Sequence, residues 1–208
     1  MKKVLIVVLI AVAFISPSIA ISAEQNRIQV GVVVGNTSVG GSPISVNSDS
    51  NTGASLMYIR DTAEFLDKTE VALGFARQSH SFGMSGDLGG GPDTTTASIA
   101  GRYRFLEESE SPHFVPYAEL GFHTTSVSSA NYMNGTLRTP SATMNGTLAG
   151  LGVRVPFSDK KYYVDLGVRQ YFGGTGDIRL ETTTGGALAT RLNMKDVTAF
   201  TLSVGGTF

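Results

Sequence analysis

The chain has 208 residues, contains no cysteine and no tryptophan, and carries a formal net charge of −1. This length suits a single domain, and the lack of cysteine excludes a disulfide framework, thiol chemistry and cysteine-ligated metals. A charge so close to neutral also excludes the basic surface that a nucleic-acid-binding protein needs.

The N-terminal segment has the pattern of a secretory signal peptide. Lys2 and Lys3 form a positive start, and an apolar run over residues 4–15 follows before small residues take over. Charge, a short apolar core and a small-residue exit are typical of an export signal. The apolar run is shorter than the roughly 20 residues that a membrane-spanning helix needs.

We expect cleavage after Ala23, with Ala20 as the alternative, so that residues 1–23 are the signal peptide and residues 24–208 the mature domain. Loss of the two signal lysines changes the net charge from −1 to −3. No other stretch is apolar over the length of a spanning helix. If the mature chain enters a membrane, it must do so as a closed β-barrel, because only helices and closed barrels satisfy every backbone polar group in lipid.

Apolar residues recur at every second position through most of the mature chain, which predicts β-strands. The first such strand begins at Arg27, where Ile28 and Val30 alternate with Gln29 and Gly31. A strand is also expected near residues 53–61, but it is apolar on both faces, so its register near residues 56–59 is left open. The alternation runs through residues 27–35, 69–76, 96–105, 116–123, 148–155, 162–172 and 200–208.

The connections between these strands alternate in length. Those near residues 61–68, 107–114 and 156–161 are short, and those near residues 37–52, 82–95, 126–142 and 173–193 are about twice as long. Short periplasmic turns and long extracellular loops are typical of transmembrane barrels, the smallest of which have about eight strands. We therefore predict an all-β fold: an eight-stranded antiparallel up-and-down transmembrane β-barrel with both ends of the domain in the periplasm.

One face of the predicted strands carries full charges at mid-strand positions. A soluble barrel or sandwich alternates in the same way, and on it these side chains would face water. Spread along the strands, they suit a polar barrel interior, where they can pair, better than a dry core. The predicted interior polar network consists of Glu70, Arg102, Arg104, Glu119, Arg154, Asp165 and Arg169.

Aromatic residues on the other face fall near the two ends of the apolar stretches, which is typical of the girdles of transmembrane barrels. The lack of tryptophan is a departure, because tryptophan usually contributes to such girdles. We expect one girdle to contain Tyr103, Phe105, Phe157, Tyr162 and Phe208, and the other Phe122, Phe172 and Phe200.

The last strand resembles the terminal strand of the outer-membrane β-barrel superfamily, and the whole layout resembles the opacity-protein, OmpX and OmpA-domain group. The resemblance rests on Phe200, Leu202, Val204 and Phe208. It implies location in the outer membrane, contact with its lipids and lipopolysaccharide, and recognition of this strand by the barrel assembly machinery. Gly206 departs from the pattern, since an aromatic or aliphatic residue is usual at that position.

No catalytic, cofactor-binding or metal-binding site is expected. The three histidines are scattered and have no cysteine partners, so they do not have metal-ligand spacing. Glu119 and His123 share a face, but four strand residues span about 13 Å, too far for a direct pair. The His-x-Ser arrangement of deacylase-type barrels is absent. A lipid A-modifying enzyme is therefore the least favoured function.

An eight-stranded barrel is just wide enough inside for side chains, so an open pore is not expected, although inward glycines leave room for a narrow path. Surface loops on a rigid scaffold commonly carry binding. The sequence thus favours a surface interaction or adhesion factor that contacts a host surface or matrix. The alternative is a narrow channel or transporter for small or hydrophobic solutes.

Particular residues are candidates for these contacts. Contact with a partner would remove the apolar side chains within these polar loops from water, which favours binding through them. The candidate loop contacts are Ile44, Tyr132, Met133 and Leu180. Arg77 lies on the outward face at the expected upper rim, where a guanidinium suits a lipopolysaccharide phosphate.

Overall fold

The computed structural model describes most of the chain after the N-terminal segment. No helix in this described part is long and apolar enough to cross a membrane. The described residues are 26–40, 45–48, 51–62, 66–79, 82–83, 93–106, 113–128, 130–132, 137–139, 142–157, 161–172, 177–179, 181–182 and 191–208.

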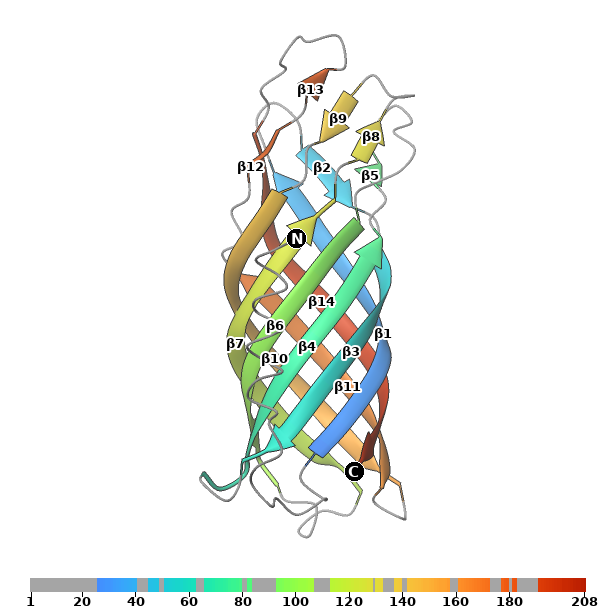
Figure 1. Cartoon of the computed structure of the whole chain (residues 1–208), viewed down its shortest axis with the longest axis vertical. Helices are drawn as coiled ribbons and strands as arrows, with labels where there is room; N and C mark the ends of the chain where they lie inside the picture. The colour runs from blue at the N-terminus through green and yellow to red at the C-terminus, as the bar shows by residue number, and fades with distance from the viewer. Residues whose placement is uncertain are drawn as a thin grey trace.

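Within these residues, eight long strands close into one antiparallel barrel (Figure 1). Each strand pairs with the next in the chain, and the last pairs with the first. The predicted fold is confirmed. The barrel strands are β1 (Asn26–Gly40), β3 (Asn51–Asp61), β4 (Thr69–Ser79), β6 (Asp93–Arg104), β7 (Val115–Val127), β10 (Ala142–Pro156), β11 (Tyr162–Phe172) and β14 (Arg191–Thr207).

The pairing is staggered around the barrel. A path across directly paired residues starts at Asp61 of β3 and passes through the other seven strands. It returns to β3 at Asn51, ten positions before its start. Such a stagger requires tilted strands, and it sets which inward side chains become neighbours.

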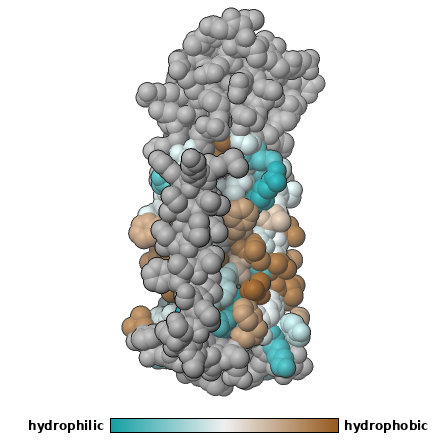
Figure 2. Space-filling model, in the orientation of Figure 1, coloured by the Kyte–Doolittle hydropathy of each residue, from teal (hydrophilic) through white to brown (hydrophobic). Residues whose placement is uncertain are grey.

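The apolar face of the barrel strands lies outside. Leu120 is 71% exposed and Phe122 67%, whereas Glu119, which directly precedes Leu120 on the same strand, is 3% exposed. Figure 2 shows apolar side chains gathered at mid-height on the visible face, with hydrophilic residues toward both ends. Exposed apolar and buried charged side chains are the reverse of a soluble protein's arrangement and fit a lipid bilayer.

The structure defines the register of β3, which the sequence left open. Leu56 faces outward and is half exposed, whereas Met57 and Ile59 point inward and are buried. With Ala72 of β4 they form a small apolar cluster inside the barrel. The strand is apolar on both faces because its inner face lines this cluster, so alternation could not reveal its phase.

The chain forms further strands beyond one end of the barrel. β2 (Ser45–Ser48), β5 (Phe82–Gly83) and β12 (Asp177–Arg179) extend the barrel sheet. β8 (Ala130–Tyr132), β9 (Leu137–Thr139) and β13 (Glu181–Thr182) form a separate sheet above it (Figure 1). All six lie in the connections that the sequence predicted to be long. Outside the apolar band a strand needs no apolar face, so alternation does not mark it.

The opposite end of the barrel holds the first and last described residues. There the backbone N–H of Phe208 donates to the carbonyl of Asn26 over 2.9 Å, and this bond joins the ends of β14 and β1. The short turns also lie at this end, which is therefore the periplasmic end of a transmembrane barrel.

Candidate functional site

Five charged residues meet inside the barrel near its periplasmic end; we call Arg27, Asp61, Glu70, Arg104 and Arg154 the mouth cluster. Glu70 on β4 accepts two hydrogen bonds from Arg154 on β10, of 2.8 and 3.0 Å. It also accepts one of 2.8 Å from Arg27 on β1. Asp61 lies 3.0 Å from the Arg104 guanidinium. Two carboxylates thus join three arginines from β1, β6 and β10.

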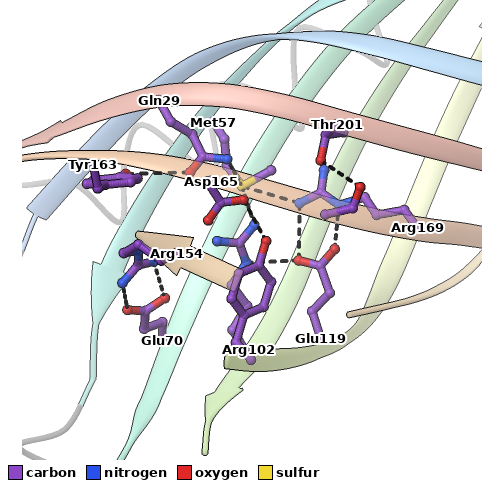
Figure 3. Close-up of polar contacts among 12 residues, drawn as sticks. Gln29, Met57, Glu70, Arg102, Glu119, Arg154, Tyr163, Asp165, Arg169 and Thr201 are labelled. Carbon is purple, nitrogen blue, oxygen red and sulfur yellow. Dashed lines mark hydrogen bonds and ion pairs between the residues drawn. The ribbon is translucent and has the colours of Figure 1, made fainter. Parts of the chain in front are cut away.

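A second group of side chains meets across the lumen farther from the periplasm; we call Met57, Arg102, Glu119 and Arg169 the central ring. Glu119 accepts a 2.8 Å hydrogen bond from Arg102 Nε and further hydrogen bonds from Arg169 Nε and Nη2. On the other side, Met57 Sδ lies 2.9 Å from Arg102 Nη2 and 3.3 Å from Arg169 Nη2. Figure 3 shows the sulfur and the carboxylate on either side of the two guanidinium groups.

An inward glycine makes room for the contact between Glu119 and Arg169. These residues lie on β7 and β11, and Gly150 lies on β10 between them, directly paired with both. A Cβ on Gly150 would come within 2.6 Å of Glu119 Oε1. Because glycine has no side chain, the carboxylate can reach across β10 to the guanidinium.

The same relationship recurs with two tyrosines. Tyr117 on β7 crosses Gly152 and donates a 2.7 Å hydrogen bond to Asp165 on β11; a Cβ on Gly152 would lie 2.4 Å from its hydroxyl. Tyr163 covers Gly205, where a Cβ would lie 2.3 Å from the ring. The space that inward glycines leave is thus filled at these positions, and it offers no narrow path there.

All seven residues of the predicted interior network lie on the inner face and are at most 6% exposed. Three of them belong to the mouth cluster and three to the central ring. Asp165 bonds to Tyr117 between the two groups. Figure 3 labels Asp165 together with Glu70 and Arg154 of the mouth cluster and with Arg102, Glu119 and Arg169 of the central ring.

Sequence reasoning missed several members of these groups. Arg27 has the same phase as Gln29 in an alternating strand, and this signal could have placed it inside. Met57 and Asp61 required the register of β3, which only the structure defines. Tyr117 and Tyr163 have the same strand phase as Glu119 and Asp165, so alternation indicates the inner face for them, but their hydrogen bonds to Asp165 and Gln29 depend on the fold.

Beyond the central ring, the inward side chains that the structure describes are uncharged. Thr96 and Thr125 share a 2.9 Å hydrogen bond. His123 lies 3.2 Å from the Thr125 hydroxyl and 3.4 Å from the carbonyl of Phe172. The buried lining also includes Val33, Gln78, Thr94, Val127, Met144 and Leu148.

Outward-facing polar pairs mark the outer edge of the apolar band. Arg77, whose side chain is 68% exposed, donates a 2.7 Å hydrogen bond to Asp93. The guanidinium expected to contact lipopolysaccharide therefore already has a carboxylate partner. We call the set of these pairs the outer collar: Arg77 with Asp93, Thr124 with Asn145, and Thr198 with Gln170.

The aromatic and terminal-strand residues lie on the outer face. Phe200, Leu202, Val204 and Phe208 are each a little over half exposed. Gly206 pairs with Tyr162 of β11, and a Cβ on it would lie 3.4 Å from the Tyr162 ring. The Tyr162 ring thus lies beside Gly206, the position at which an aromatic or aliphatic side chain is usual. The other girdle residues, namely Tyr103, Phe105, Phe122, Phe157 and Phe172, are also exposed.

The candidate loop contacts are not placed by the structure. Ile44, Met133 and Leu180 lie outside the described residues, and Tyr132 lies in β8, of which only the backbone is described. They stay predictions.

The described residues bring no catalytic constellation together around the histidine considered for acyl transfer. Glu119 is held by Arg102 and Arg169, while His123 contacts Thr125 and a backbone carbonyl. Among the described residues, no group of three or more His, Asp or Glu side chains could hold a metal ion. The absence of an enzymatic function stays a prediction.

The fold is similar to solved structures of bacterial outer-membrane proteins. OprG from Pseudomonas aeruginosa has a TM-score of 0.64 and 15% identity, over 88% of this chain and 96% of that chain. A major outer-membrane protein from Thermus thermophilus has a TM-score of 0.52 and 15% identity, over 87% and 99%. AlkL, solved in lipid bilayers, has a TM-score of 0.50 and 13% identity, over 92% and 94%.

No family model matches the chain, and no curated protein matches it. The chain thus has the fold of the small bacterial outer-membrane β-barrels, and its apolar exterior and charged interior fit it to a lipid bilayer.

Proposed function

We propose that the protein is an outer-membrane barrel without an open pore, which acts at the cell surface through the segments beyond its outer collar. One observation carries this proposal: charged side chains meet across the lumen, while the barrel strands continue beyond the outer collar. β1 and β14 remain paired as far as Gly40 and Asn193, and β2, β5 and β12 add to them. A rigid scaffold that holds surface segments commonly serves binding.

The contacts inside the lumen support the first half of the proposal. Glu70 and Arg154 join β4 to β10, which are separated in the wall by β6 and β7. The central ring forms a second obstruction. An eight-stranded barrel has little internal space beyond that of its own side chains, so these two groups leave no wide path for solutes.

The proposed partner is a host surface or matrix component, met by the segments beyond the collar. We also propose that outer-leaflet lipopolysaccharide contacts the collar at Arg77, and that the assembly machinery binds the outward residues of β14 during insertion. An exposed guanidinium at the edge of an apolar band suits a lipid phosphate.

The test is segment exchange. Replacing residues 128–141, which contain β8 and β9, by a short Gly-Ser turn should abolish adhesion of expressing cells to immobilised matrix. Replacing residues 107–112, in a connection that the sequence predicts to be periplasmic, in the same way is the matched control and should leave adhesion unchanged. The amounts of folded protein in the outer membranes of the compared cells are first matched, as judged by heat-modifiable migration. Unchanged adhesion after the first replacement would remove the support for a surface interaction through this segment.

Solute passage is the second candidate function, and one observation favours it. Where the structure describes its side chains, the lumen beyond the central ring is lined by uncharged groups, including Val33, Met144 and Leu148, so along that stretch a small or hydrophobic solute meets no charged side chain. Conductance in planar bilayers and uptake of neutral solutes by proteoliposomes test this candidate. A protein that is silent in both assays while correctly inserted is not a channel.

A further inference from the structure

We propose that the centre of the lumen is a binding site for a small monovalent anion, and that the Met57 thioether occupies this site in the closed barrel. The proposal goes beyond the surface function and does not depend on it. It concerns the central ring, where the neutral side chain of Met57 contacts the guanidinium groups of Arg102 and Arg169.

Hydrogen-bond donors converge on the Met57 sulfur. Arg102 Nη2 lies 2.9 Å from Sδ and Arg169 Nη2 3.3 Å from it. The carboxamide nitrogen of Gln29 lies 3.6 Å away on a third strand. A thioether is a weak acceptor, whereas guanidinium groups form their strongest hydrogen bonds with anions. Donors from β1, β6 and β11 thus surround a point that an anion would satisfy better than sulfur does.

The charge balance of the ring points the same way. Arg102 and Arg169 share one carboxylate, that of Glu119, and Asp165 lies nearby, bonded to Tyr117, whose ring the Arg102 guanidinium covers. Counted over all the described inward charges, five arginines face four carboxylates, so one positive charge is in excess: Arg27, Arg102, Arg104, Arg154 and Arg169 against Asp61, Glu70, Glu119 and Asp165. Arg102 Nη1 is buried and has no hydrogen-bond partner among the described residues. An uncompensated buried charge is costly. A monovalent anion would neutralise this excess charge, whereas a thioether cannot.

The surroundings of Met57 allow the side chain to withdraw. Methionine is unbranched and has flexible side-chain bonds. Gly74 lies beside its tip: a Cβ there would be 3.6 Å from Met57 Cε and 3.7 Å from Arg169 Nη1. The same Cβ would lie 2.5 Å from Ser98 Oγ, so a bare backbone and a small hydroxyl border the thioether on that side. Withdrawal of the thioether from the two arginines then requires rotation about the Met57 side-chain bonds.

Two variants separate the anion site from simple loss of packing. Met57→Ala removes the sulfur and frees its space, whereas Met57→Leu keeps a side chain of similar size without an acceptor. Crystals of both variants, grown or soaked with sodium bromide, are examined by anomalous diffraction. We expect bromide within hydrogen-bond distance of Arg102 and Arg169 in the alanine variant and none at that point in the leucine variant.

The result that overturns the proposal is equally specific. No bromide at the ring of the alanine variant, bromide at the ring of both variants alike, or an adventitious ion only, bound elsewhere, would each contradict it. Heat-modifiable migration first establishes that both variants are folded.

A measurement in solution gives an independent answer. An anion that binds only the folded barrel raises its apparent stability in proportion to the logarithm of its concentration. At constant ionic strength, replacing gluconate by chloride should raise the unfolding temperature of Met57→Ala and leave that of Met57→Leu unchanged. The rise should disappear in Met57→Ala combined with Arg169→Gln. Equal responses of all three variants would exclude the site.

Discussion

Arg154 and Glu70 join two sides of the barrel: the Arg154 guanidinium on β10 donates two hydrogen bonds, of 2.8 and 3.0 Å, to the Glu70 carboxylate on β4. β6 and β7 separate these strands in the wall, so the contact crosses the lumen instead of following the sheet. It ties together residues that are 84 positions apart in the chain.

Removing this carboxylate is expected to destabilise the barrel strongly. Glu70→Gln leaves Arg27 and Arg154 buried without their shared counter-charge, and breaking a buried ion pair on one side costs about 3 to 5 kcal/mol. Urea unfolding followed by circular dichroism in lipid vesicles measures the free energy of unfolding. Arg77→Gln breaks an exposed pair and is the control, with an expected change below about 1 kcal/mol. Equal changes in the two variants would contradict a structural role for the mouth cluster.

The glycine beneath Tyr117 should be intolerant of a side chain. In Gly152→Ala the new Cβ would lie 2.4 Å from the Tyr117 hydroxyl, which must then move away from Asp165. Overpacking of this kind costs about 1 to 3 kcal/mol. Gly101→Ala is the matched control, because a Cβ there meets nothing within 4 Å. The urea midpoints of the two variants are compared with that of the unaltered protein, and a midpoint shift no larger for Gly152→Ala than for Gly101→Ala would disprove the crowding argument.

The register of β3 can be tested with single nitroxide labels, because the chain contains no cysteine. A label at Leu56→Cys should face the lipid and show high accessibility to oxygen in electron paramagnetic resonance. A label at Ile59→Cys should be shielded, since Ile59 is 0% exposed. The opposite pattern would mean that β3 is shifted by one residue, which would turn its inner face outward.

Lipopolysaccharide contact at the outer collar should depend on the balance between Arg77 and Asp93. Arg77→Ala removes the cation and is expected to reduce the amount of lipopolysaccharide retained on the purified barrel. Asp93→Asn releases the guanidinium from its 2.7 Å ion pair and is expected to increase retention. Native mass spectrometry measures bound lipid in each variant. If neither substitution changes retention, Arg77 is not a lipopolysaccharide contact.

Phe208 is expected to matter for insertion more than for stability. Phe208 is 56% exposed on the outward face at the periplasmic end of the barrel, and alanine would retain its backbone bond to Asn26. In Phe208→Ala we expect less folded protein in outer membranes but an unchanged urea midpoint after refolding into detergent. Phe122→Ala, which removes an exposed ring from β7, outside the terminal strand, is the control. A normal folded level in cells would show that this residue is not needed as an assembly signal.

Strand faces were readable from the sequence wherever only one face is apolar. Glu119 and Arg154 were assigned to the interior because both neighbours along each strand are apolar or small and face lipid. Alternation failed to mark the two faces of β3, where Met57 and Ile59 add apolar side chains to the inner face. It also failed beyond the collar, where a strand has no lipid-facing side and therefore no alternating pattern.

The partners of the interior charges were not readable in the same way. Alternation places Arg102, Arg169 and Glu119 on one face but says nothing of which residues meet. Their contact depends on strand order, on the ten-residue stagger between Asp61 and Asn51, and on Gly150, which lets Glu119 reach across a strand.

The sequence by itself determined the class of structure and the division between an apolar outside and a charged inside, because alternation is a local property of each strand. Only the tertiary structure decided that Arg154 reaches Glu70 and that Met57 lies between two guanidinium groups. Such contacts join distant strands, and they exist only once the sheet has closed with one particular stagger and its inward glycines have made room.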